Sequence, residues 1–184
     1  MAIAMTLLVL ELKIPELGPA ADSRELAAAL LAQTPRFVAF ILSFFIIGEA
    51  WTEHHRVGGL LHGFDYGLLW WNLLLLFFIV LMPFVTGLVS EKDRALSVVL
   101  YAAVFGALGL AKVGFWFHAR RRGLIDHARD RMGRSISFGL WATPTVALLV
   151  AGSALAGFRQ AMWGFFLIPA IAYVLHRLSR LAPR

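Results

Sequence analysis

The segment FDYGLLWWNLLLLFFIVLMPFVTGLV, residues 64–89, decides the fold class, because no charged residue follows Asp65 along its length. A helix needs about 20 mostly apolar residues to cross the roughly 30 Å hydrocarbon core of a bilayer. This segment exceeds that length, and it lacks the two-residue alternation of a transmembrane β-strand. The segment therefore predicts a membrane-spanning α-helix.

The composition of the whole chain favours several helices of this kind. Of its 184 residues, 60% are hydrophobic and 15% are charged. Soluble domains usually contain about 45–50% apolar and about 25% charged residues. A chain this short cannot bury such an excess of apolar surface in one aqueous core. The sequence thus predicts an all-α, polytopic membrane protein with a single domain over residues 1–184.

Six apolar segments are expected to be transmembrane helices. They cover about residues 1–12, 34–51, 64–89, 95–118, 136–158 and 161–175. At about 1.5 Å per residue, the first segment reaches only part of the way across a bilayer. We therefore expect it to be the outer part of a longer helix that begins upstream of Met1. Between the first two segments, Ser23 is expected to cap a short surface helix over residues 24–33.

Arginine is concentrated on one side of the predicted membrane. The loop of residues 118–134 holds six arginines, and the C-terminal tail adds three. Because basic residues are enriched in cytoplasmic loops, this bias places the loop and both chain termini in the cytoplasm. The net charge of +6 is then explained by membrane topology and requires no nucleic acid. The expected location is the cell membrane, with the lipid bilayer as a partner.

An apolar stripe runs along the first segment at helical spacing. It consists of Ile3, Thr6, Leu7 and Leu10. In one interpretation the stripe packs against neighbouring helices. In the other it lines a pore, where rings of Ile and Leu expel water and a Thr hydroxyl replaces part of an ion's hydration shell. Leu8 lies about 100° round the helix and is expected to pack, while Glu11 either attracts cations or is a solvated interfacial carboxylate.

Two adjacent histidines, His54 and His55, follow Trp51 near the end of the second segment. Neighbouring side chains on a helix diverge, whereas zinc-binding helices use an i, i+4 pair, so no metal site is expected. No Ser/His/Asp set, carboxylate pair or phosphate-binding loop predicts a catalytic site or a cofactor. Two alternatives stay open: a membrane-embedded metal-binding protein or enzyme that uses these histidines with His62 and His118, and a small-solute transporter.

Three of the polar residues within the apolar segments carry specific expectations. A buried Asn costs free energy unless it is paired, so Asn72 is expected to face another helix. Glu49 and Lys112 lie toward the predicted cytoplasmic ends of their segments. Both are expected to extend their charged groups to the membrane surface, and no charge is expected at the centre of a span.

Three motifs resemble the transmembrane protein 175 family, prokaryotic branch, in their order and spacing. They are AIAMTLLVLELKIP at residues 2–15, WTEHHR at residues 51–56, and WNL at residues 71–73 followed by LMPF at residues 81–84. The similarity is specific in the first half of the chain and mainly hydropathic in the second. One departure is that the family signature Arg-x-x-x-Phe-Ser-Asp, which should end shortly before Ala2, is absent from the sequence.

The resemblance implies a passive, potassium-permeable cation channel rather than an enzyme. It implies a homotetramer of six-helix subunits in which the first helix of each lines a central pore, with potassium as the permeant ion and no cofactor. By position, the apolar constrictions correspond to Ile3, Leu7 and Leu10, and a nearby hydroxyl to Thr6. A polar network that braces the first helix corresponds to His54 or His55 together with Asn72.

Overall fold

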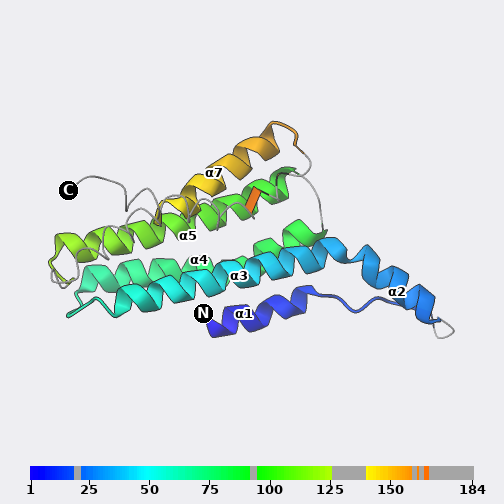
Figure 1. Cartoon of the computed structure of the whole chain (residues 1–184), viewed down its shortest axis with the longest axis horizontal. Helices are drawn as coiled ribbons and strands as arrows, with labels where there is room; N and C mark the ends of the chain where they lie inside the picture. The colour runs from blue at the N-terminus through cyan, green and yellow to red at the C-terminus, as the bar shows by residue number, and fades with distance from the viewer. Residues whose placement is uncertain (19–21, 92–94, 126–139, 159–160, 162–163, 166–184) are drawn as a thin grey trace, which may run out of the picture.

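The described part of the chain is built from helices. The computed structural model describes residues 1–18, 22–91, 95–125, 140–158, 161 and 164–165 (Figure 1). The helices are α1 (Ala2–Leu7), the 3-10 turn η1 (Leu8–Glu11), α2 (Ser23–Ala32), α3 (Thr34–Gly58), α4 (Tyr66–Glu91), α5 (Ala95–Arg121) and α7 (Ala142–Leu155). Within those residues the only β-type pairing is an isolated bridge between Leu61 and Ile125.

The helices α3, α4 and α5 are long and apolar enough to cross a membrane. They confirm that the chain is a membrane protein. Two of these helices extend beyond the predicted spans, which end at about residues 51 and 118, because α3 continues to Gly58 and α5 to Arg121. The α3 extension contains His54, His55 and Arg56, and the α5 extension contains Arg120 and Arg121. Basic residues are favourable near the negative end of the helix dipole.

The remaining predicted spans are described only in part. Residues 1–12 form α1 and η1, and α7 covers most of the predicted span 136–158. Residues 136–139 and nearly all of the span 161–175 lie outside the described residues, as do the arginines of the tail. Six transmembrane helices thus stay a prediction.

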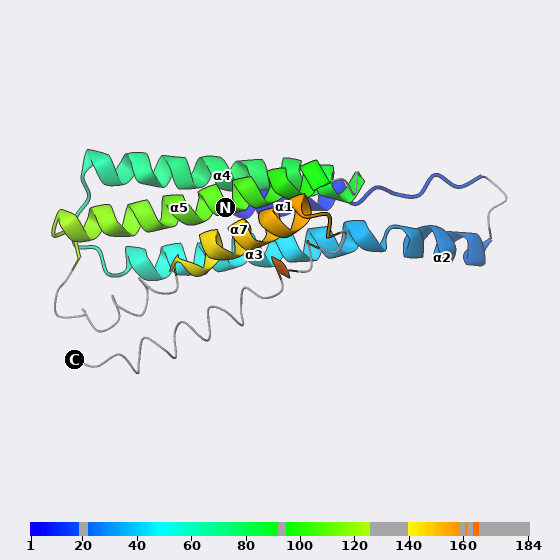
Figure 2. The same ribbon diagram turned by 90° about the horizontal axis from the view of Figure 1, so that it is seen from above.

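The bundle has α3 and α4 side by side in its middle. Helix α1 lies along one side of this pair, and α5 and α7 lie on the opposite side (Figures 1 and 2). Close approach of α5 and α7 depends on Gly109, where a Cβ atom would lie 2.7 Å from Pro144 and 2.8 Å from Thr143. Helices with small residues at their contact approach closely, which strengthens van der Waals packing in a membrane.

A network of hydroxyl groups joins three helices in the core. The Ser43 hydroxyl on α3 lies 2.7 Å from the Thr86 hydroxyl on α4 and 2.8 Å from the Tyr101 hydroxyl on α5. Thr86 also donates to the Met82 carbonyl at 2.7 Å. All three hydroxyl side chains are buried. Because each oxygen has a partner, the network links the helices without leaving a polar group unsatisfied.

At the Arg-rich end of the bundle, Asp65, just before α4, contacts groups from both α4 and the end of α5. One Asp65 oxygen accepts the Leu68 N–H at 2.7 Å, capping the helix, and lies 2.9 Å from the His118 Nε2. The other lies 3.5 Å from the Arg122 Nε. The Leu68 N–H, and then His118 and Arg122, hold the pKa of Asp65 below its usual range. His118 therefore joins the end of α5 to the start of α4.

At the opposite end, α2 projects beyond the bundle (Figures 1 and 2). The sequence predicts Ser23 as its cap, and this is wrong by one residue. The Asp22 carboxylate accepts the backbone N–H groups of Arg24 and Glu25 at 2.9 and 2.8 Å. Ser23 is instead the first helical residue. Both Asp and Ser are favoured N-caps, and Asp adds a charge that the helix N-terminus stabilises.

Candidate functional site

Helix α1 has one buried face and one exposed face. Ala4 and Leu8 are buried in the core. Ile3, Leu7 and Leu10 are 75%, 42% and 70% exposed. These members of the stripe singled out in the sequence therefore lie on the exposed face of α1, and Leu8 packs as expected.

Contacts with α3 and α4 hold α1 in place. A Cβ atom on Gly48 would lie 3.7 Å from the Met5 methyl group, so Met5 packs against α3 at the Gly48 backbone. On α4, Gly87 leaves room for the Glu11 carboxylate, whose Cδ would be 2.7 Å from an added Cβ. Small residues at these two positions allow the helices to approach closely. The side chains Met5 and Glu11 thus fix the two ends of α1 and η1 against the bundle.

Thr6 is the polar member of the exposed stripe. Its hydroxyl donates to the Ile3 carbonyl at 2.8 Å. A donating hydroxyl keeps its oxygen lone pairs free to accept or to ligate a cation. Thr6 therefore presents an oxygen between two apolar side chains of the exposed face.

A cavity of about 380 Å³ brings together the polar residues of the second and third motifs. Its lining includes His54, His55 and Asn72, with Phe64, Leu68, Leu69 and Phe115 among the apolar members. The amide oxygen of Asn72 is buried and has no hydrogen-bond partner among the described residues. The expected pairing of Asn72 with another helix is therefore not found in the described part of the chain.

The two adjacent histidines point in different directions, as their spacing predicts. The His54 ring packs against Phe115 of α5, with ring centroids 5.4 Å apart. The His55 ring stacks on Trp51 of its own helix at 5.7 Å. No group of three or more His, Cys, Asp or Glu residues that could hold a metal ion is found in the described part of the chain.

Lys112 is the residue that sequence reasoning placed wrongly. Its side chain does not extend to the membrane surface, because it is only 4% exposed and its Nζ lies 3.1 Å from Glu49 Oε2. Glu53 forms a second ion pair with the same ammonium group. The i, i+4 spacing of Glu49 and Glu53 is a local signal for a shared partner, but which helix supplies the partner depends on the packing.

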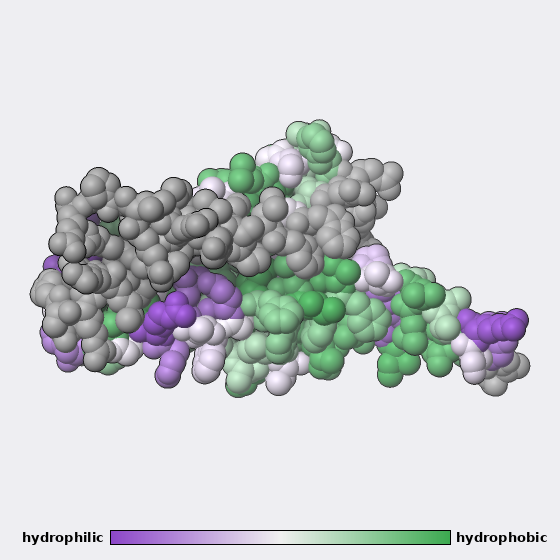
Figure 3. Space-filling view, viewed as in Figure 1, coloured by the Kyte–Doolittle hydropathy of each residue, from purple (hydrophilic) through white to green (hydrophobic). Residues whose placement is uncertain are grey.

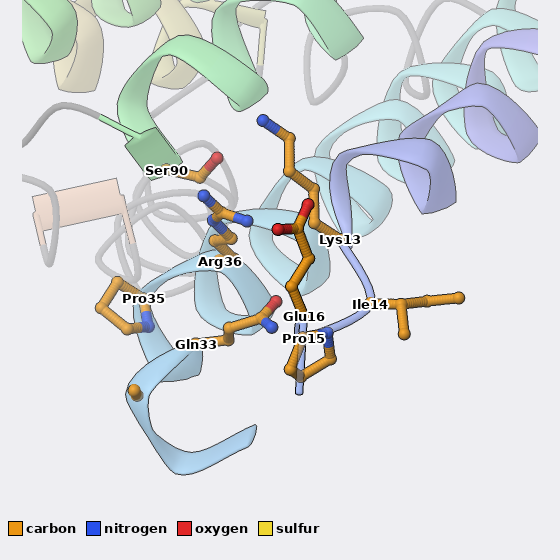
Figure 4. A pocket seen from close by; sticks show the side chains of 9 residues that line it. Lys13, Ile14, Pro15, Glu16, Gln33, Pro35, Arg36 and Ser90 are labelled. Carbon is orange, nitrogen blue, oxygen red and sulfur yellow. The ribbon is translucent and has the colours of Figure 1, made fainter. Parts of the chain in front are cut away.

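A second cavity, of about 440 Å³, opens where η1 exits, α3 begins and α4 ends. Its lining is Lys13, Ile14, Pro15, Glu16, Ala32, Gln33, Pro35, Arg36 and Ser90 (Figure 4). Side chains of both charge signs line it together with an amide and a hydroxyl group. This polar cavity lies at the end of the bundle to which Leu10 and Glu11 also belong.

The surface agrees with a helix bundle set in lipid. Figure 3 shows hydrophobic surface over the first half of α3 and hydrophilic surface over its second half and at the tip of α2. Exposed apolar side chains of α3 include Ile41, Phe44 and Phe45. Apolar patches of this size on a membrane helix face lipid or another protein surface.

Comparisons with known proteins agree with the motifs. Residues 1–83 match the family model described as "Endosomal/lysosomal potassium channel TMEM175". A protein from Streptomyces collinus named as a potassium channel is 37% identical over 134 residues, covering 70% of this chain and 63% of that protein. Another protein, from Chamaesiphon minutus and also named as a potassium channel, is 35% identical over 122 residues, covering 64% of this chain and 60% of that protein. The chain thus spans somewhat less than two thirds of these relatives.

The fold agrees as well. The crystal structure of a lysosomal potassium-selective channel TMEM175 homolog from Chamaesiphon minutus superposes with a TM-score of 0.72 and 28% sequence identity. The match covers 98% of this chain and 90% of that one. The resemblance carried by the three motifs to the TMEM175 family is therefore confirmed, with the family-model match over residues 1–83 and the structural similarity over 98% of the chain.

Proposed function

We propose that the protein is a potassium-permeable cation channel that conducts passively through a central pore. The observation that carries this proposal is the exposed face of α1, where Ile3, Leu7 and Leu10 turn away from their own subunit. Relatives named as potassium channels support the choice of ion. These relatives carry out transport, so the proposal is one of conduction and not of catalysis.

The proposed pore is formed by four subunits. One stripe on one subunit cannot enclose a conduit, whereas copies related by a rotation axis can. Around a four-fold axis, Ile3, Leu7 and Leu10 make stacked apolar rings, which close a narrow path by expelling water. Thr6 adds a ring of hydroxyl oxygens between them, where a cation regains part of its coordination. The assembly is therefore a homotetramer with α1 at its centre.

The polar cavity is proposed to brace the pore helix. His54, His55 and Asn72 line it together. The orphaned amide oxygen of Asn72 needs a donor, because a buried oxygen without one costs about 1–3 kcal/mol. A donor supplied by the first helix of the complete assembly satisfies this oxygen and holds that helix.

The proposed topology has six transmembrane helices with both termini in the cytoplasm, in the cell membrane. Arg56 near the end of α3, and Arg120, Arg121 and Arg122 at the end of α5, support a cytoplasmic position for that end of the bundle. The cavity that includes Lys13 and Arg36 then belongs to the outer end.

The test is reconstitution into liposomes with a potassium gradient. For a channel, we expect potassium flux to rise linearly with the potassium concentration and to persist when a metal chelator is added. Flux that saturates with the potassium concentration indicates a carrier. If the protein shows no flux, either in the presence or in the absence of zinc, the proposal is contradicted. Native mass spectrometry in detergent is expected to show tetramers, and monomers alone would contradict the symmetric pore.

A further inference from the structure

Lys112 is a buried charge inside a membrane-spanning helix. Its ammonium group is shared between Glu49 and Glu53, both on α3. Burying a single charge without partners costs several kcal/mol, so the lysine is held only where α3 supplies carboxylates. Ionisable residues at membrane depth are rare, and in this chain the group belongs to neither the exposed α1 stripe nor the polar cavity.

The geometry of this ion-pair cluster specifies the height of α3, that is, the position of α3 along its own axis relative to α5. Glu49 and Glu53 are one helical turn apart, so their carboxylates project from the same side of α3. The ammonium group contacts both, and sliding α3 along its axis takes at least one carboxylate out of contact. Helix α5 is itself held by its packing with α4 and with α7 at Gly109. Lys112 therefore acts as a fixed reference point for α3.

The adjacent residue on α3 connects this cluster to α1. Gly48 precedes Glu49, and the Met5 methyl group packs against α3 at Gly48. Helix α1 and helix α5 lie on opposite sides of the α3 and α4 pair (Figures 1 and 2). A change in the height of α3 is therefore transmitted to Met5.

We propose that Lys112 is a positioning residue for α1. By holding Glu49 and Glu53, it sets the height of α3, and through Gly48 it sets where the exposed stripe of α1 lies along the pore. This inference rests on the proposed function for its effect on ion selectivity, but its structural part stands on the Met5 contact alone.

Removing the lysine alone is not a sufficient test. Lys112→Met leaves two carboxylates one turn apart without their counter-ion, and this variant is expected to be strongly destabilised. The triple variant Glu49→Gln, Glu53→Gln, Lys112→Met removes all three charges together. The large cost of a broken buried ion pair comes from the charge left without a partner, and the triple variant leaves no such charge. The triple variant therefore separates positioning from stability.

The first measurement uses crosslinking and requires no ion flux. The chain has no cysteine, so Met5→Cys with Gly48→Cys introduces a single pair across the contact. Because the 3.7 Å separation is measured to the terminal methyl group of Met5, a short bifunctional thiol reagent replaces the side-chain length that Met5→Cys removes. We expect efficient crosslinking by this reagent with Lys112 present and at least about a two-fold slower rate in the triple variant, the lower end of effects exerted by coupled remote residues. Equal rates in the two backgrounds would overturn the proposal.

The second measurement is the ratio of potassium to sodium flux in liposomes. We expect the ratio to fall by at least about two-fold in the triple variant while its melting temperature stays near that of the wild type. Lys112→Arg keeps the charge and is expected to retain the wild-type ratio. The control Arg121→Met removes one exposed charge from the end of the same helix and is expected to change neither quantity.

The two measurements distinguish the failure of each idea. A wild-type protein without flux, whose crosslinking nonetheless depends on Lys112, contradicts the channel and supports the positioning role. A triple variant with wild-type flux ratio and wild-type crosslinking shows that the ion-pair cluster only stabilises the fold, and overturns the proposal.

Discussion

The two faces of α1 are chemically alike but structurally opposite. Leu7 and Leu8 are adjacent leucines, yet Leu8 is fully buried while Leu7 is 42% exposed. The difference arises because α3 and α4 cover only one side of α1. An apolar helix that the neighbouring helices cover on one side only presents a second, exposed surface, and the proposed pore would use that surface. Substitutions at matched positions on the two faces test this division.

The largest expected effect is on stability, at the buried face. Leu8→Ala removes a fully buried side chain, and such changes typically cost about 2–5 kcal/mol. Leu7→Ala, the same chemical change one residue earlier, is expected to cost well under half as much in the isolated subunit. Thermal unfolding of the detergent-solubilised protein measures both. Equal losses at the two positions would remove the distinction between the faces.

The next effect is on conduction, at the exposed face. Leu7→Ala shortens one apolar ring, which widens and hydrates that layer of the pore. We expect potassium flux in liposomes to rise and discrimination against sodium to weaken. Leu8→Ala serves as the control, since it should alter packing without changing the ring. If the two variants behave alike in flux and in selectivity, the exposed stripe does not line the pore.

A smaller effect is expected where the polar cavity braces α1. Asn72→Leu removes an amide that is proposed to bond to the first helix in the assembled protein. Interhelical hydrogen bonds in membranes are worth roughly 1 kcal/mol, so the tetramer should lose about that much stability. Selectivity should be unchanged, because Asn72 does not belong to the exposed stripe. Unchanged stability together with altered selectivity would reassign Asn72 to the ion path.

The smallest effect is expected at Thr6. Thr6→Val keeps the side-chain shape and removes the hydroxyl that donates to Ile3. We expect the preference for potassium over sodium to fall by about 1 kcal/mol or less, the usual worth of one hydrogen-bonding group. Expression and melting temperature should stay at wild-type levels. A variant with unaltered reversal potential in mixed potassium and sodium would show that the hydroxyl is not an ion ligand.

Two clusters of polar residues that include α3 illustrate which features a sequence does not predict. Ser43 joins a hydroxyl network, and Glu49 joins an ion-pair cluster, and both reach α5. Neither link was predicted, since each depends on residues about sixty positions apart along the chain. The expectation that Lys112 reaches the membrane surface failed for this reason. A long flexible side chain takes whichever partner the packing brings near.

The sequence by itself determined the helical membrane class, the central parts of α3, α4 and α5, the family resemblance and the apolar stripe of α1. These depend on apolar runs and helical spacing, which are local properties of the chain. The tertiary structure alone decided that Leu8 is covered while Leu7 is not, and that Lys112 is buried between two carboxylates. These outcomes depend on which helices meet and at what height, and no local pattern carries that information because the contacts form only when distant segments pack together.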